Sequence, residues 1–118
     1  MRKLIFSCSL LFLVMSCSEV VLVEDISGNS IGILAPKDGV VLHDHVVIFT
    51  WEEVEDAETY TIQIAKPNFV NAVQILTDST TTSLNFRKEL EPGAYQWRVR
   101  GENSEYYTAY STQSFNIE

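Results

Sequence analysis

Short segments in which apolar and polar residues alternate follow one another along most of the chain, separated by clusters of Gly, Pro, Asp and Asn. The alternation is clearest in "YTIQI" at 60–64 and in "YQWRV" at 95–99, where every second residue falls on one face. A period of two is that of a half-buried β-strand, and no segment shows a convincing apolar period of helix length. The pattern therefore predicts an all-β domain.

Seven strands are expected after residue 30. Their expected ranges are Ile31–Ala35, Val46–Trp51, Thr59–Ala65, Val73–Thr77, Ser83–Phe86, Ala94–Arg100 and Ser111–Ile117. Many short strands at this spacing, with turn residues between them, are typical of a β-sandwich, in which the inward faces of two sheets form one core. A chain of 118 residues suffices for one such domain.

The N-terminus has the pattern of an export signal. Arg2 and Lys3 precede an apolar run over 4–15 that is too short to span a bilayer as a lasting helix. The run ends in "VMSC", which resembles the lipobox of bacterial lipoproteins and implies that Cys17 becomes the first residue of the mature chain and carries lipid. A thiolate is the strongest nucleophile among side chains, which explains a cysteine at this point. The alternative is a plain secretory signal in which Cys17 is incidental.

This interpretation divides the chain into a signal peptide (1–16), a lipidated N-terminus and tether (17–30) and a β-domain (31–118). Ser18 after the lipidated cysteine resembles lipoproteins that are sent on to the outer membrane. Glu19 resembles, more weakly, the acidic surface-export signals of some Bacteroidetes lipoproteins. The expected location is therefore the cell envelope, in an outer membrane lipoprotein, on either its periplasmic or its surface face.

Charge and cysteine content narrow the possible partners. Without Arg2 and Lys3 the mature chain has 6 basic and 16 acidic residues, a net charge of −10. Such a surface repels nucleic acid and anionic headgroups, so we expect no nucleic-acid partner. Cys8 leaves with the signal and Cys17 is consumed by lipid, so no disulfide is expected and stability must come from packing.

The order "PKDG … FTWEEVEDAETY … LEPGAYQWRVRGEN" resembles the fibronectin type III domain, an immunoglobulin-like sandwich, over Ile31 to Glu118. The resemblance implies that Trp51, on the second strand, fills the core between the sheets. It also implies that Tyr95, after the "LEPG" turn, forms a tyrosine corner, in which the hydroxyl bonds back to the backbone. The domain is then expected to be a binding or scaffolding module.

Two polar clusters invite a metal interpretation. His43 and His45 lie two residues apart and so share one face of an extended segment, but a structural metal site needs four ligands. The turn Glu52–Glu58 holds five carboxylates, which suit calcium, yet it lacks the Asp and Gly positions of a known calcium loop. We expect a polar loop and a solvated turn in which Val54 and Ala57 pack, and no metal or cofactor.

No constellation of nucleophile, base and orienting acid can be assembled from the mature sequence, so we expect no enzyme. Tyr106, Tyr107 and Tyr110 gather near the last turn, where a sandwich exposes its loops, and are the candidate binding residues. The expected function is a lipid-anchored, non-enzymatic module that binds an envelope protein. The alternative is a carbohydrate-binding accessory lipoprotein of a polysaccharide-uptake system.

Overall fold

A computed structural model describes residues 22–118, which form a β-sandwich; the expected signal peptide and Cys17 lie outside the described residues. The strands are β1 (Ile33–Ala35), β2 (Val40–Leu42), β3 (Val46–Trp51), β4 (Thr59–Lys66), β5 (Gln74–Thr81), β6 (Asn85–Glu89), β7 (Gly93–Glu102) and β8 (Ser111–Ile117). The described part of the chain contains no helix long and apolar enough to cross a membrane. The all-β prediction is confirmed.

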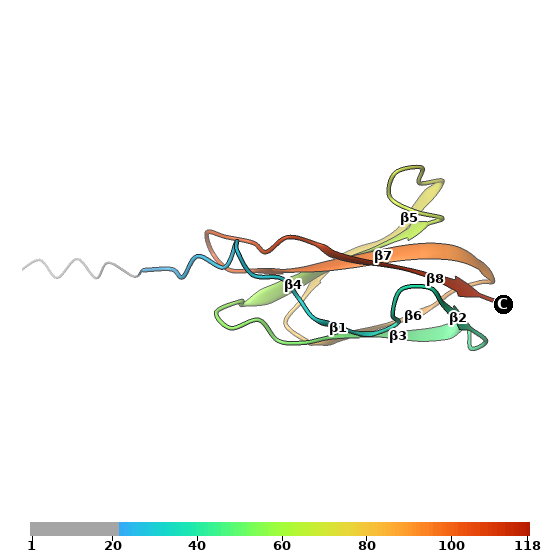
Figure 1. The fold of residues 1–118 in the computed structure, drawn as a ribbon, viewed down its shortest axis with the longest axis horizontal. Helices are drawn as coiled ribbons and strands as arrows, with labels where there is room; N and C mark the ends of the chain where they lie inside the picture. The colour runs from blue at the N-terminus through green and yellow to red at the C-terminus, as the bar shows by residue number, and fades with distance from the viewer. Residues whose placement is uncertain (1–21) are drawn as a thin grey trace, which may run out of the picture.

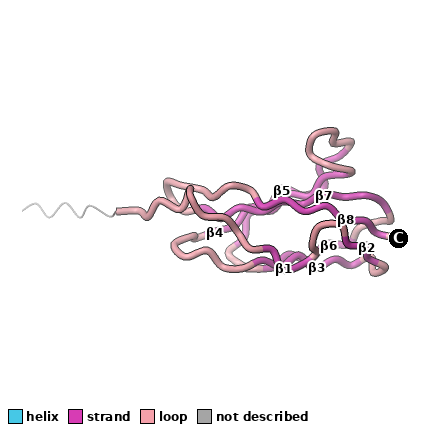
Figure 2. Tube along the Cα trace, viewed as in Figure 1, coloured by secondary structure: helices cyan, strands magenta, loops and turns pink. Residues whose placement is uncertain are grey.

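The strands form two sheets that face each other (Figures 1 and 2). One sheet has the order β1-β3-β6 and the other the order β2-β8-β7-β4-β5. All neighbours are antiparallel except β2 and β8, which run parallel, with Val40 opposite Phe115. The chain crosses between sheets after Ala35, so the first strand of the sandwich is divided into β1, paired with β3, and β2, paired with β8.

The seven expected strands are all present, and β3 and β8 have the expected bounds. β5 and β6 extend further along the chain than expected, because their outer faces are polar and the apolar signal in the sequence stops early. β2 is an eighth segment that the sequence pattern does not predict. It has only three residues, too few for an alternation, and its pairing is with a strand about 75 residues away.

The core lies between the sheets and is rich in aromatic rings. Trp97 from β7 is fully buried, and its ring lies 4.9 Å from that of Phe49 and 6.3 Å from that of Trp51 on the opposite sheet. Phe115 from β8 adds an edge contact to Phe49 at 5.8 Å. Alternation in β3 and β7 puts these side chains on the inward faces, as the sequence predicts.

The tyrosine corner is also confirmed. The Tyr95 hydroxyl donates a hydrogen bond of 2.6 Å to the backbone oxygen of Glu91, four residues earlier. The ring is 3% exposed and stacks on Phe115 at 5.5 Å. Gly93 makes the approach possible, since its φ of 155° belongs to a region that side chains avoid. The turn into β7 is thereby tied to the strand that follows it.

Ordered packing begins before the expected domain start at residue 31. Ile26 is 1% exposed, and its carbonyl accepts the N–H of Asn29 in a turn. The side chain of Asn103, in the β7–β8 loop, donates 2.9 Å to the carbonyl of Glu24 and 3.3 Å to that of Asp56. One amide thus connects the N-terminal segment with the β3–β4 and β7–β8 turns at one end of the sandwich.

Candidate functional site

The three candidate tyrosines all lie in the β7–β8 loop. Asn103 closes the turn, since its Oδ1 accepts the N–H groups of Glu105 and Tyr106 at 3.1 and 2.8 Å. Tyr107 then forms an isolated antiparallel β-bridge with Glu102, and Tyr107 is 58% exposed. Tyr106 and Tyr110 are half-buried. The loop is therefore ordered by its own backbone contacts, and only one of its three rings is presented freely to solvent.

Two of the tyrosines belong to a stacked row on the outer face of the five-stranded sheet. The guanidinium of Arg100 lies 4.2 Å from the ring centroid of Tyr107 and 4.8 Å from that of Tyr110. The guanidinium of Arg98 lies 4.4 Å from Tyr110 and 4.1 Å from Phe69. We call these five side chains the stacked row. Tyr106 makes no such contact within the described residues.

The row follows from the period of β7. Trp97 and Val99 point into the core, so Arg98 and Arg100 must point outward on the same face, two residues apart. The sequence therefore shows the two arginines as neighbours. It does not show Phe69, which comes from the β4–β5 loop and is positioned by a hydrogen bond of 2.9 Å from its N–H to the Gln96 side chain.

The two arginines have different partners. Arg100 donates through Nε to Glu102 at 2.8 Å, and both side chains are about three-quarters buried. Arg98 donates through Nε to the neutral amide oxygen of Gln63 at 2.8 Å, across the β4–β7 pair. A guanidinium over an aromatic face is stabilised by the ring quadrupole, so each ring also fixes its arginine.

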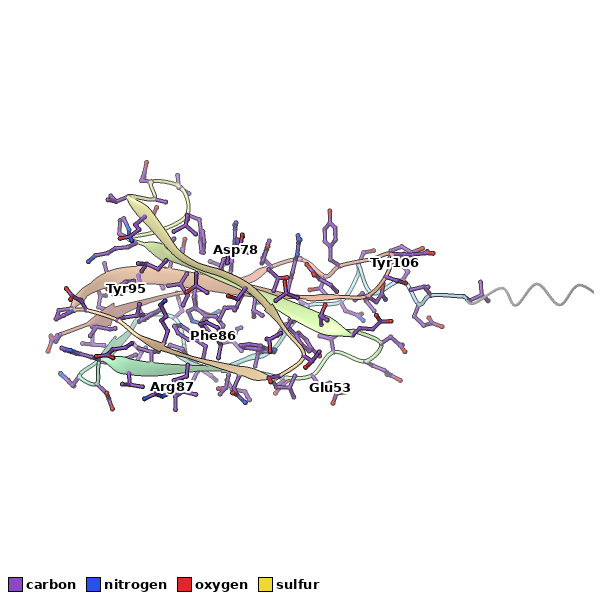
Figure 3. All side chains as sticks on the ribbon, turned by 180° about the vertical axis from the view of Figure 1, so that it is seen from behind. Glu53, Asp78, Phe86, Arg87, Tyr95 and Tyr106 are labelled. Carbon is purple, nitrogen blue, oxygen red and sulfur yellow. The ribbon has the colours of Figure 1, made fainter. Side chains whose placement is uncertain are left out.

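The acidic turn Glu52–Glu58 lies next to the tyrosine turn, as the topology predicts. Glu58 donates its N–H to the carbonyl of Glu102 at 2.7 Å, and Figure 3 shows Glu53 and Tyr106 at the same end of the sandwich. All five carboxylates of the turn are exposed. Val54 is 6% exposed and its N–H is bonded to the Tyr60 hydroxyl, so the turn is held by the core and its acids remain solvated.

The histidine pair lies at the opposite end. His43 and His45 are both exposed. The His43 ring lies 3.4 Å from the carboxylate of Glu118, and the His45 ring lies 3.3 Å from the backbone oxygen of Glu118. Within residues 22–118 no group of three or more His, Cys, Asp or Glu side chains is arranged to hold a metal ion.

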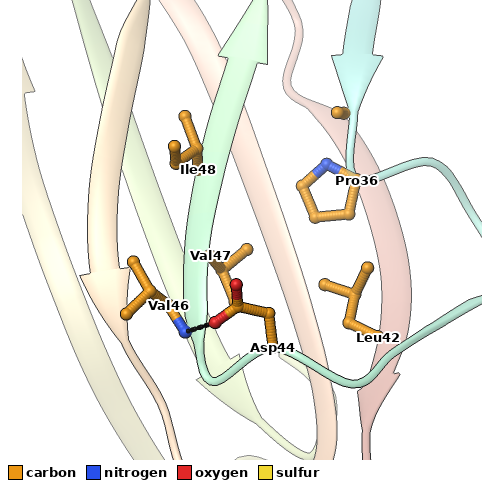
Figure 4. Close-up of a pocket in the computed structure, with 7 residues that line it drawn as sticks. Pro36, Leu42, Asp44, Val46, Val47 and Ile48 are labelled. Carbon is orange, nitrogen blue, oxygen red and sulfur yellow. Dashed lines mark hydrogen bonds between the residues drawn. The ribbon is translucent and has the colours of Figure 1, made fainter.

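A small apolar hollow of about 130 Å³ lies where the chain crosses between the sheets (Figure 4). It is lined by Ala35, Pro36, Leu42, Asp44, Val46, Val47 and Ile48. Its one carboxylate, Asp44, accepts the N–H of Val46 at 2.9 Å. Asp44 therefore lies just before the start of β3, on the edge that, within the described residues, has no partner strand there once the first strand has crossed to the other sheet.

Comparison with known proteins supports the fold assignment. The order of strands, the tyrosine corner and the aromatic core define an immunoglobulin-like sandwich of the fibronectin type III kind. Similar solved structures include a Clostridium thermocellum CbhA fibronectin(III)-like module, with 9% identity, a TM-score of 0.55 and coverage of 75% of this chain and 95% of that one. No family model and no curated protein matches the chain.

Two further structures have the same fold. The FN3tt crystal structure is 17% identical, with a TM-score of 0.53 and coverage of 75% of this chain and 88% of that one. A fibronectin type III domain from the human KIAA0970 protein is 13% identical, with a TM-score of 0.53 and coverage of 74% and 72%. Domains of this fold commonly serve as binding or scaffolding modules. At these identities the comparisons establish the fold alone.

Proposed function

We propose that the protein is a lipid-anchored, non-enzymatic module of the bacterial cell envelope that binds a protein partner through the stacked row. The anchor rests on the "VMSC" pattern at Cys17, and an outer membrane location rests on Ser18. The binding role is carried by one observation. Tyr107 is 58% exposed, yet its ring is held over Arg100, so it offers a large contact area with little conformational entropy left to lose.

A carbohydrate-binding accessory lipoprotein is the second candidate, because an exposed tyrosine face can stack on a sugar ring. In the stacked row, however, guanidinium groups lie over the rings of Tyr110 and Phe69. Arg100 also lies over the ring of Tyr107, so of the three rings in the row only the exposed part of Tyr107 is left for a sugar. Two arginines beside an acidic turn offer a patterned charge that a protein surface can match, which favours the protein partner.

The binding prediction uses Tyr107→Ala, with Tyr106→Ala as the matched control from the same turn. Pull-downs from envelope extracts with the anchored protein should retain a partner with wild type and Tyr106→Ala, and lose it with Tyr107→Ala. Retained binding should weaken with ionic strength, because exposed charges are screened over about 10 Å at 0.1 M salt. Binding to a glycan array that is independent of salt would favour the second candidate. Unchanged binding by Tyr107→Ala would place the site elsewhere.

The anchor prediction concerns Cys17. Cys17→Ser should remain uncut by the lipoprotein signal peptidase and should not incorporate labelled palmitate, because the hydroxyl cannot replace the thiolate in thioether formation. Cys8→Ser is the matched control and should be labelled like wild type. Labelling of the Cys17→Ser variant would show that the lipid, if any, is attached at another residue.

A further inference from the structure

On the outer face of the five-stranded sheet, Arg98 is held by two aromatic rings and one hydrogen bond. Phe69 covers it from the side of Gln96, to which the Phe69 N–H is bonded. Tyr110 covers it from the side of Arg100, which the same ring also contacts. The guanidinium therefore lies between two rings that approach from opposite directions along β7, and rotation out of this slot would lose both contacts.

The donor groups of Arg98 are only partly used. Its Nε–H is bonded to Gln63, and within residues 22–118 its two terminal nitrogens make no hydrogen bond or ion pair. The residue as a whole is half-buried, and within residues 22–118 its charge is not paired with a carboxylate. An arginine fixed by stacking and by one Nε bond presents its outer N–H groups in the planar fork that matches a carboxylate.

The neighbouring arginines serve as comparisons within the same chain. Arg100 has similar ring contacts, but Glu102 already supplies its carboxylate at 2.8 Å. Arg87, on the outer face of the other sheet, is exposed and makes no ring contact within the described residues. Among these three, Arg98 alone has a guanidinium that is fixed by two rings and has no carboxylate partner within the described residues.

We propose that Arg98 is a carboxylate-binding site, and that the carboxylate is a side chain of the protein partner inferred above. The proposal rests on the proposed function for the identity of the partner, but not for the chemistry of the site. The guanidinium carbon lies 4.1 Å from the ring centroid of Phe69 and 4.4 Å from that of Tyr110, so an anion bound to its outer N–H groups lies beside two aromatic rings. The negative faces of these rings oppose a doubly charged phosphate more than a singly charged carboxylate.

The test measures the site without any partner. The full chain, purified in non-ionic detergent, is titrated with sodium acetate against sodium chloride at matched ionic strength. The arginine side-chain N–H signals and the Phe69 backbone amide are followed by NMR. Because the Arg98 side chain is already fixed and loses less rotamer freedom on binding than the exposed Arg87, we expect its signals to reach half their shift at about tenfold lower acetate than those of Arg87.

Arg98→Lys keeps the charge but removes the planar fork, so it should abolish the acetate response at the Phe69 amide. Arg87→Lys is the matched control and should leave that response unchanged. A response of Arg98 no stronger than that of Arg87, or a Phe69 response that persists in Arg98→Lys, would overturn the proposal. A stronger response to inorganic phosphate than to acetate would overturn the carboxylate assignment in favour of a phosphoryl group. None of these outcomes bears on whether Tyr107 contacts a partner.

Discussion

The side chain of Trp97 contacts both the opposite sheet and the crossing between the sheets. Its indole N–H donates 3.1 Å to the carbonyl of Pro36, at the crossing between the sheets, and its ring touches aromatic residues of the opposite sheet. Both the sheets and the crossing therefore depend on one side chain. The sequence predicts its burial from the alternation in β7, but the bond to Pro36 needs the pairing of β2 with β8 to be known.

Trp97→Ala should lower the free energy of unfolding by about 3–5 kcal/mol, because it removes a large side chain from a closely packed interior. Chemical denaturation of the Ser18–Glu118 fragment measures the loss. Ile48→Ala, at an apolar side chain that is 56% exposed, is the control and should change stability by about 0.5 kcal/mol or less. A loss under about 1 kcal/mol for Trp97→Ala would contradict the buried position.

Tyr95→Phe isolates the hydrogen bond of the tyrosine corner from the packing of its ring. The ring stays on Phe115, while the bond of 2.6 Å to Glu91 is lost and leaves the carbonyl of Glu91 without that donor. We expect a loss of about 1 kcal/mol in the free energy of unfolding. Tyr107→Phe, at an exposed ring, is the control. Equal effects of the two changes would mean that the Tyr95 hydroxyl adds nothing to the corner.

At the scale of elements, the sequence predicts what depends on alternation and misses what depends on pairing across long distances. β3 is predicted with correct bounds because its inward residues are strongly apolar, and β8 because Phe115 and Ile117 alternate with polar residues. The sequence does not predict the short β2. It does not predict the stacked row either, because Phe69 and Tyr110 meet Arg98 only after three separate segments are brought together. The sequence predicts the three candidate tyrosines as a cluster, and within the described residues only Tyr107 and Tyr110 contact the arginines of β7.

The open edge of β3 shows how one polar residue can limit strand addition. β1 pairs with β3 only near its end, at Thr50 and Trp51, so the earlier residues of β3 have no strand on that side within the described part of the chain. Asp44 occupies the first N–H of this edge, that of Val46. A charge at a sheet edge opposes pairing with a strand of another chain. Asp44 therefore protects this edge of β3 against strand addition.

At the scale of the whole molecule, charge is distributed unevenly along the sandwich. The end that holds the acidic turn and the tyrosine turn is also the end from which the N-terminal segment leads, as Figure 1 shows. The sequence predicts a net charge of −10 for the expected mature chain, but not that the acidic turn lies beside Glu102, because the backbones of Glu58 and Glu102 meet only in the folded chain. The basic fork of Arg98 lies further along the outer face of the same sheet.

The hydrogen bonds of Asn103 hold the N-terminal segment at the tyrosine turn, which affects how a partner could reach that turn. Ile26 is buried, and it follows Cys17 by nine residues, which span at most roughly 30 Å when extended. With lipid on Cys17, the tyrosine turn would stay within that height of the bilayer. A partner inserted in the same membrane would meet it by lateral diffusion at a high effective concentration, whereas a large freely diffusing particle would be hindered by the lipid surface. The hydrogen bonds of Asn103 would thus favour partners in the same membrane over partners that diffuse in solution.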